Sequence, residues 1–236
     1  MNLSALRALP DALLGHLLPT ACPSCGREPD VTACRPFCSE CFDDLDPWGP
    51  ACPLCGRRVP GDEVCGPCRL DPPPQAAMAH ALAYEGGARE ALHLWKFRGA
   101  YTLTAPLAGK LLPLLNALPE PLKNAPLVPV PPHPWRLFGK DYHPATLLAR
   151  ALGETGGRAV HPLLTKRTLH RPQSALDRAT RLRNIRGTFA ARGAVPGAVI
   201  VVDDVCTTGA TLREALTILR RAGARDLAAL TLARTP

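Results

Sequence analysis

The chain has 236 residues, enough for one or two domains with a sizeable core, and only 5% of them are aromatic. The formal net charge of +8 at pH 7 indicates a polyanionic ligand such as a nucleotide or a nucleic acid. No apolar run approaches the roughly 20 residues that cross a bilayer, so we expect no membrane insertion and a cytoplasmic location.

The N-terminal part is rich in cysteine. After an amphipathic helix expected over residues 1–18, eight cysteines form four Cys-x-x-Cys pairs. Two pairs can supply the four thiolates of a tetrahedral Zn²⁺ site, so the four pairs predict one or two structural Zn²⁺ ions. Pairing in chain order is the default, although interleaved pairing also fits the spacing. Disulfides are the alternative, but no signal sequence supports an oxidising compartment. The predicted ligands are Cys22, Cys25, Cys38, Cys41, Cys52, Cys55, Cys65 and Cys68.

A proline run at residues 71–74 predicts a stiff linker. It divides the chain into an N-terminal helix with a double zinc-ribbon module (1–74) and a second domain (75–236). Within the second domain, strands expected at 79–84, 127–130, 159–164, 199–202 and 227–232 alternate with helices beginning near residue 88 and at 102–118, 143–153 and 212–221. This alternation predicts an α/β fold, a mainly parallel sheet flanked by helices.

Positive charge is concentrated in residues 158–192, where Asp177 is the only acidic residue. Residues 168–190 read as an extended basic loop with a short helix at 174–183. Basic side chains without dense aromatics favour contact with pyrophosphate or with nucleic-acid phosphates, and a solvated surface is the plainer alternative. The candidates for nucleic-acid or pyrophosphate binding are Lys96, Lys166, Arg167, Arg171, Arg178 and Arg181.

The most informative stretch runs from Val199 to Leu212. Four β-branched residues predict a strand buried on both faces, and the acidic pair Asp203-Asp204 follows them. A short run of small and hydroxyl residues, 207–211, then enters an amphipathic helix. Unpaired backbone N–H groups at such a helix start bind anions, and carboxylates beside them can accept hydrogen bonds from a sugar diol. The pattern therefore predicts a ribose 5-phosphate site.

This stretch resembles the signature of type I phosphoribosyltransferases, which bind phosphoribosyl pyrophosphate (PRPP) together with Mg²⁺. The resemblance implies that Asp203 and Asp204, the catalytic candidates, hold the ribose hydroxyls, and that residues 207–211 hold the 5-phosphate. It also implies that a proline-rich turn after the strand at 127–130 faces pyrophosphate. The implied PRPP-binding residues are Val202, Asp203, Asp204, Cys206, Thr207, Thr208, Gly209, Ala210, Thr211, Val130, Pro131 and Lys140.

Across nearly the whole chain, the motifs resemble the ComF family of competence proteins, which join a zinc ribbon to a phosphoribosyltransferase domain. The matching blocks are Tyr84, Gly86, Lys96, Phe97 and Gly99; then 128–131; then Lys166, Arg167, Gln173, Leu176, Arg181, Asn184 and Phe189. One motif departs from the family, because 140–145 reads Lys-Asp-Tyr-His-Pro-Ala where Arg-Gly-Phe-Asn-Gln-Ala is usual.

The resemblance implies a PRPP-binding protein of natural transformation that handles incoming single-stranded DNA in the cytoplasm. Competence and DNA-uptake proteins, helicase-like or DNA-processing, are the implied protein partners. An active phosphoribosyltransferase with an unknown acceptor is one alternative, since no acceptor pocket is recognisable in the sequence. A zinc-dependent scaffold for DNA-uptake proteins is the other.

Overall fold

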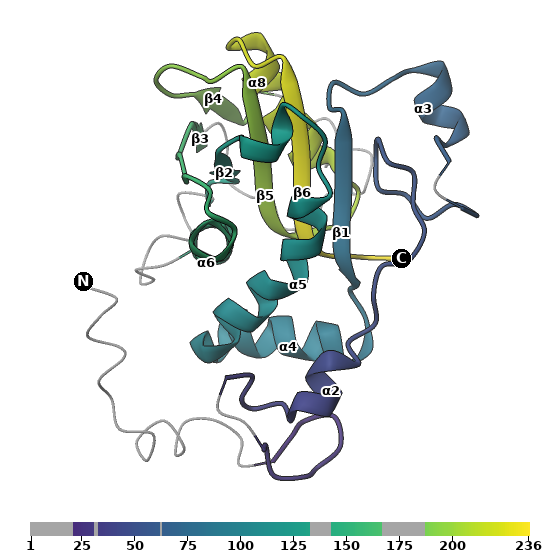
Figure 1. Ribbon diagram of the computed structural model, residues 1–236, viewed down its shortest axis with the longest axis vertical. Helices are drawn as coiled ribbons and strands as arrows, with labels where there is room; N and C mark the ends of the chain where they lie inside the picture. Colours follow the sequence, from purple (N-terminus) through teal and green to yellow (C-terminus); the bar gives the residue numbers. More distant parts are fainter. Residues whose placement is uncertain (1–20, 31–32, 62, 133–142, 167–186) are drawn as a thin grey trace, which may run out of the picture. The chain divides into compact units, whose positions relative to one another are not determined.

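The computed structural model describes residues 21–30, 33–61, 63–132, 143–166 and 187–236 (Figure 1). The helices expected at 1–18 and 174–183 lie outside these residues. The chain forms two compact units, each assembled from two separate stretches. One unit comprises Met1–Asp46 and Glu85–Pro106, and the other comprises Pro47–Tyr84 and Leu107–Pro236. The two zinc-ligand sets fall into different units, while the boundary at residue 74 stays a prediction.

The first unit contains α2 (Ser39–Asp43), α4 (Gly86–Phe97) and the 3₁₀ turn η2 (Tyr101–Leu103). Helix α4 is amphipathic, because Ala88, Ala91, Leu92, Leu94 and Trp95 are buried on one side of it. The indole Nε1 of Trp95 donates a hydrogen bond of 2.9 Å to the hydroxyl of Thr104, which satisfies a polar group in the apolar interior.

The second unit is built on a four-stranded sheet in the order β1-β6-β5-β2. The strands are β1 (Ala77–Ala83), β2 (Leu127–Pro129), β5 (Ala198–Cys206) and β6 (Asp226–Arg234). All three pairings are parallel, so the carboxyl ends of the four strands meet at one edge. The predicted mainly parallel sheet is confirmed.

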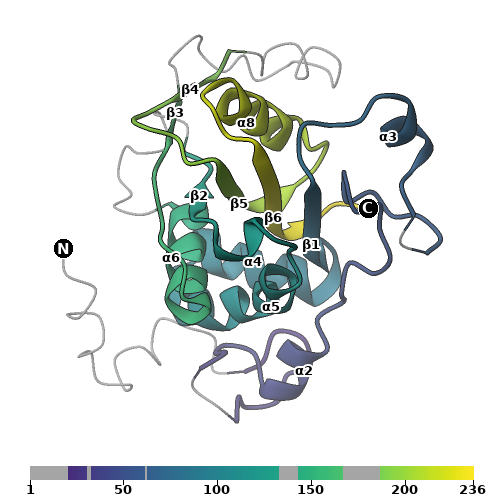
Figure 2. The ribbon, with the colours of Figure 1, turned by 45° about the horizontal axis from the view of Figure 1, so that its top comes forward.

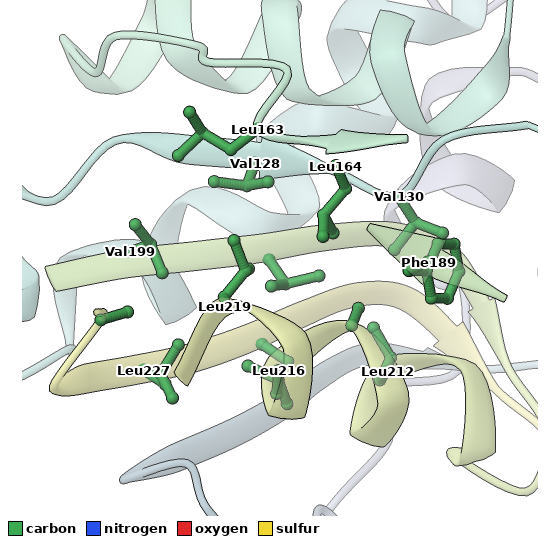
Figure 3. Close-up of a cluster of buried hydrophobic side chains, with 14 of the residues drawn as sticks. Val128, Val130, Leu163, Leu164, Phe189, Val199, Leu212, Leu216, Leu219 and Leu227 are labelled. Atoms are coloured by element: carbon green, nitrogen blue, oxygen red, sulfur yellow. The ribbon is translucent and has the colours of Figure 1, made fainter. Parts of the chain in front are cut away.

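Helices of the second unit cover the sheet on both faces (Figure 2). Helix α8 (Ala210–Arg221) lies on one face, where its Leu212, Leu216 and Leu219 pack against Val199 and Leu227 in a continuous apolar core (Figure 3). Helix α6 (Pro144–Gly156) covers the opposite face beside β5 and β2. The remaining helical elements are α3 (Gly66–Leu70), α5 (Thr104–Asn116) and η3 (Leu122–Asn124).

A second, antiparallel sheet consists of β3 (Leu164–Lys166) and β4 (Phe189–Ala191). The sequence predicted a strand at 159–164, whereas Val160 forms only a single bridge to Leu127 and the strand begins at Leu164. The proline at position 162 explains the difference, because proline has no N–H to donate to a strand ladder.

Candidate functional site

Strand β5 carries the acidic pair to the carboxyl edge of the sheet. The strand continues beyond the expected end at Val202 to Cys206, and Asp203 pairs in register with Thr231 of β6. One oxygen of Asp203 accepts the amide of Asp204 at 2.9 Å, and one oxygen of Asp204 accepts the amide of Val205 at 2.6 Å. Both residues are half-buried. These backbone bonds hold the carboxylates in place at the edge where ligands of parallel sheets bind.

Strand β2, on the other side of β5, ends before β5 reaches the acidic pair. Its register with β5 ends at Pro129 and Val202, and the amide of Val130 donates the last bond to the carbonyl of Val202 at 2.9 Å. Val130 is buried and Pro131 is half-buried. Among the described residues, the ladder between β5 and β2 ends at Val202, one residue before the acidic pair.

The loop after β5 turns into α8 at Gly209, which has φ of +75°. This left-handed conformation favours glycine, because a side chain would strain the turn. The carbonyl of Gly209 accepts the amide of Arg213 at 2.9 Å, which starts the helix. The exposed Thr207 and Thr208 complete the turn before it.

The backbone amides of this loop can donate hydrogen bonds to an anion. Within the part of the chain that the structure describes, no protein acceptor takes the amides of Thr207, Thr208 or Thr211, while the amide of Gly209 faces the sulfur of Cys206. The amide of Ala210 makes only a long contact of 3.4 Å to the hydroxyl of Thr208. Unpaired N–H groups at the start of a 12-residue helix form an electropositive site for a phosphate group.

Cys206 lies beneath this loop and is 3% exposed. Burial is the main cause that raises the pKa of its thiol to about 11, against the opposing positive charge of Arg234. The thiol is therefore neutral at physiological pH. Its sulfur atom lies against Gly209 of the loop.

The eight predicted zinc ligands form two groups of four. Cys22, Cys25, Cys38 and Cys41 make the first cluster, and Cys52, Cys55, Cys65 and Cys68 make the second, with the sulfur atoms of each within 4.8 Å of one another. Pairing thus follows chain order. A tetrahedral site with Zn–S bonds of about 2.3 Å requires sulfur atoms about 3.8 Å apart. The distances of 3.7 Å between Cys25 and Cys38 and 3.6 Å between Cys55 and Cys65 match this requirement.

Each cluster contains a thiol that ionises easily. A side-chain hydrogen bond from Arg27 lowers the pKa of Cys25 to about 6. Burial raises the pKa of Cys52, but amide hydrogen bonds, first that of Cys65, outweigh it and bring the value to about 6. Since thiolates are the form that binds Zn²⁺, both clusters have the donor set and the charge of a structural zinc site.

The second cluster is attached to the sheet through its backbone. Arg234, the last residue of β6, donates from Nη1 to the carbonyl of Cys55 at 2.7 Å and contacts Nε2 of His80 at 2.9 Å. Burial, assisted by the charge of Arg234, lowers the pKa of His80 to about 3, so the ring is neutral and Nε2 is the acceptor. Nδ1 then carries the proton and donates to Thr231 at 2.6 Å.

The other predicted site residues are placed as follows. Lys166 ends β3 with its Nζ 5.6 Å from the centre of the Phe189 ring, and Lys96 lies in the last turn of α4 in the first unit. Lys140, Arg167, Arg171, Arg178 and Arg181 lie outside the described residues. No described helix is long and apolar enough to span a bilayer.

Arg234 and His80 were not predicted from the sequence. A lone histidine in the apolar run of β1 is a weak signal for a buried polar partner. No sequence signal identifies Arg234, because its role depends on the distance in space between β6 and the second cluster.

Comparisons with known proteins match this architecture. Residues 13–69 match the model of the double zinc ribbon domain. The chain is 28% identical to DNA utilization protein YhgH of Salmonella typhi and 28% identical to competence protein F of Haemophilus influenzae, with 84% of this chain and 90% of each relative covered. Competence protein ComFC of Streptococcus pneumoniae is 26% identical, over 84% of this chain and 87% of the relative.

Two solved structures align with part of the chain. The allosteric regulatory enzyme of purine biosynthesis aligns with 55% of this chain and 25% of its own, at 24% identity and a TM-score of 0.36. A glutamine mutant of an invariant aspartic acid in HPRTs aligns with 57% of this chain and 76% of its own, at 14% identity and a TM-score of 0.33. Over 84% of its length the chain is similar to proteins named for competence and DNA utilization, in agreement with the resemblance that its motifs indicated.

Proposed function

We propose that this protein binds PRPP at the loop between β5 and α8 and acts in natural transformation, handling incoming single-stranded DNA in the cytoplasm. The observation that carries the proposal is the set of loop amides without a protein acceptor in the described residues, directly after two carboxylates. Phosphate donors beside diol acceptors suit a ribose 5-phosphate.

Each part of the ligand has a counterpart in the proposed site. The amides and hydroxyls of residues 207–211 bind the 5-phosphate, and Asp203 and Asp204 accept hydrogen bonds from the ribose hydroxyls. The backbone at Val130 and Pro131, where β2 ends, faces the pyrophosphate together with Lys140. Carboxylate and phosphate oxygens are the ligands Mg²⁺ prefers, so this acidic edge suits the Mg²⁺–PRPP complex.

The same site supports a second function, phosphoribosyl transfer to an acceptor. When pyrophosphate leaves, the bond between it and C1 of ribose breaks with its electron pair, and the ring becomes positively charged. Two carboxylates beside the ring stabilise that charge, and the loop amides keep the sugar phosphate in place. The end of the β2–β5 ladder at Val202 favours this candidate, because the turn after β2 begins there, next to the acidic pair.

The proposal of DNA binding is based on the positive net charge of the chain and on the names of its relatives. Proteins named for competence and DNA utilization align with 84% of this chain, and the sequence carries an excess of eight positive charges. Lys166, Arg167, Arg171, Arg178 and Arg181 are the proposed phosphate contacts, with Lys96 in the first unit. Binding through phosphates weakens steeply with salt, because counterions are released on association.

Calorimetric titration with PRPP and Mg²⁺ tests the proposal. Asp203→Asn combined with Asp204→Asn should weaken PRPP binding at least about tenfold, since hydrogen bonds to charged groups contribute about 1.5–3 kcal/mol each. Asp226→Asn, at the opposite end of the sheet in β6, is the matched control and should bind normally. A wild-type chain that binds no PRPP refutes the proposal.

Two further measurements separate the candidates. Release of pyrophosphate from PRPP in the presence of candidate acceptors establishes transfer, and its absence leaves a binding protein. Repeating the PRPP titration with single-stranded DNA present measures the coupling between the two ligands, which is reciprocal. A scaffold for DNA-uptake proteins would bind neither ligand.

A further inference from the structure

Two aromatic side chains are exposed on the first unit. Phe97, the last residue of α4, is 59% exposed, and Tyr101, the first residue of η2, is 36% exposed. Every other phenylalanine and tryptophan among the described residues is buried. Only 5% of the chain is aromatic, so two exposed rings within five residues differ from the rest of the molecule. Single exposed apolar residues are ordinary in proteins, whereas neighbouring ones indicate a binding surface.

The turn that carries these two rings is fixed by hydrogen bonds. Gly99, with φ of +76°, ends α4, and the amide of Ala100 donates to the carbonyl of Leu94 at 3.3 Å. The hydroxyl of Thr102 donates to the carbonyl of Arg35, in the first zinc-ribbon segment, at 2.9 Å. Because the turn is held in place before a ligand arrives, little conformational entropy is lost when one binds.

The rings themselves also have defined positions. His93 precedes Phe97 by one turn on the exposed side of α4, and the centres of their rings are 5.3 Å apart, with the planes inclined at 48°. The Tyr101 ring lies back toward the helix end, since its Cε2 is 3.8 Å from the position that a Cβ would take at Gly99. Contact with His93 restricts the Phe97 ring, while more than half of that residue's surface stays in solvent.

The surroundings of the two rings are basic. Half-buried Lys96 precedes Phe97, exposed Arg98 follows it, and exposed Arg89 lies about two turns earlier on the same side of α4. Glu90 is the only acidic residue of this helix, so three positive charges and one negative charge leave a net charge of +2. Single-stranded nucleic acid matches both features of the surface, because it combines negative phosphates with exposed planar bases.

We propose that Phe97 and Tyr101 form a stacking platform for the unpaired bases of single-stranded DNA, with Lys96 and Arg98 contacting the adjacent phosphates. The inference rests on the proposed handling of single-stranded DNA and identifies a place where its bases bind. Every base has an aromatic face, so binding by stacking is largely independent of sequence. In a duplex the bases stack on one another, so the platform favours a single strand over a duplex.

The test compares two strands of equal length and charge, oligo(dT) and an abasic strand, by fluorescence anisotropy with the full zinc-loaded chain. The wild type should bind oligo(dT) about tenfold more tightly, the effect of one base stacked on an aromatic ring. Phe97→Ala should remove most of this preference, whereas Phe97→Tyr keeps the ring and should retain it. Equal affinity for the two strands in the wild type, or a preference that survives in the Phe97→Ala, Tyr101→Ala chain, overturns the proposal.

The salt dependence of binding separates the rings from the charges. Phe97→Ala should weaken oligo(dT) binding at every salt concentration without changing the slope of log affinity against log salt. Arg98→Gln should instead reduce that slope by about 0.7, the contribution of one phosphate contact on a single strand. Leu70→Ala is the control, because Leu70 is apolar, 90% exposed and part of the second unit. Equal losses of affinity in Leu70→Ala and Phe97→Ala refute the platform.

Two further measurements separate the platform from the proposed function. Duplex DNA should bind the wild type and Phe97→Ala alike, and a duplex affinity that falls as much as that of oligo(dT) refutes a role for unpaired bases. The PRPP titration should be unchanged in Phe97→Ala. A wild-type chain that binds no single strand refutes the proposed DNA handling and the platform together, whereas strand binding that does not depend on Phe97 refutes the platform alone.

Discussion

Each cysteine cluster begins with a Cys-x-x-Cys-Gly turn, residues 22–26 and 52–56, which we call its knuckle. The two knuckles have the same backbone but different surroundings. In each, the glycine after the second cysteine donates to the carbonyl of the first cysteine at 2.8 Å, in a left-handed turn at Gly26 and Gly56. The space beside Gly26 is open, and Arg27 next to it pairs with the exposed Glu40. Gly56 instead faces His80, and its carbonyl accepts the Trp48 indole at 2.8 Å.

The difference shows that one motif can have two roles in one chain. The first knuckle belongs to the first unit and is exposed to solvent. Its role is therefore to bind metal and to stabilise its own turn. The second knuckle is bonded to β6 through Arg234 and to β1 through the amide of Met78, which donates to Pro53 at 2.8 Å. Metal bound there should therefore stabilise the sheet and the edge at which the proposed ligands bind.

The largest expected effect is removal of one metal site. Cys52→Ser with Cys55→Ser should remove one zinc ion and destabilise the sheet unit by several kcal/mol, because the carbonyl that Arg234 contacts loses its fixed position. Cys22→Ser with Cys25→Ser should also remove one zinc ion but leave hydrogen exchange in β1 and β6 unchanged. Metal analysis and amide exchange measure both. Equal deprotection of the sheet in the two variants would contradict the comparison.

The next effect is a substitution of glycine by alanine in each knuckle. Both glycines have positive φ, which costs a side chain about 1–2 kcal/mol. At Gly56 the added Cβ would also lie 2.1 Å from Nε2 of His80, a clash that forces the ring and its hydrogen bonds to move. Gly56→Ala should therefore lower the free energy of unfolding by about 3 kcal/mol or more. Urea denaturation of Gly26→Ala gives the cost of the backbone alone.

A smaller effect is expected from the arginines beside the knuckles. Arg234→Met keeps the apolar stem but leaves the carbonyl of Cys55 and Nε2 of His80 without their donor, which should cost about 2 kcal/mol. Arg27→Met removes an exposed pair with Glu40 and a surface hydrogen bond to Cys25, and should shift the denaturation midpoint much less. If both changes shift the midpoint alike, Arg234 has no special role in joining the second knuckle to the sheet.

Much of this arrangement follows from local sequence. The β-branched run before Asp203 predicted a buried parallel strand, and Leu212, Leu216 and Leu219 predicted the apolar face of α8. The Cys-x-x-Cys spacing predicted both metal clusters, because ligand geometry depends on residues close together in the chain.

What the sequence could not predict depends on contacts between distant segments. The extension of β5 through two aspartates depends on its ladder with β6, which outweighs their low strand propensity. The grouping of the second cluster with the sheet depends on Arg234, which is 179 residues from Cys55. The oxygen of Gln75, unpaired among the described residues, could likewise not be predicted, because it is identified only from the hydrogen bond between the Gln75 amide nitrogen and the carbonyl of Leu54.

The smallest effect concerns the thiol beneath the loop, and it changes reactivity without changing stability. The pKa of Cys206 is about 11, so in the zinc-loaded chain at pH 7.5 its thiol should react slowly with iodoacetamide. Relative to an ordinary thiol of pKa 9.0, Cys206 should react about 10- to 100-fold more slowly. Peptide mass spectrometry measures each rate, with the urea-unfolded chain as control. Rapid labelling of Cys206 in the zinc-loaded chain would mean that the loop opens readily, and the proposed phosphate site in the loop would not be preformed.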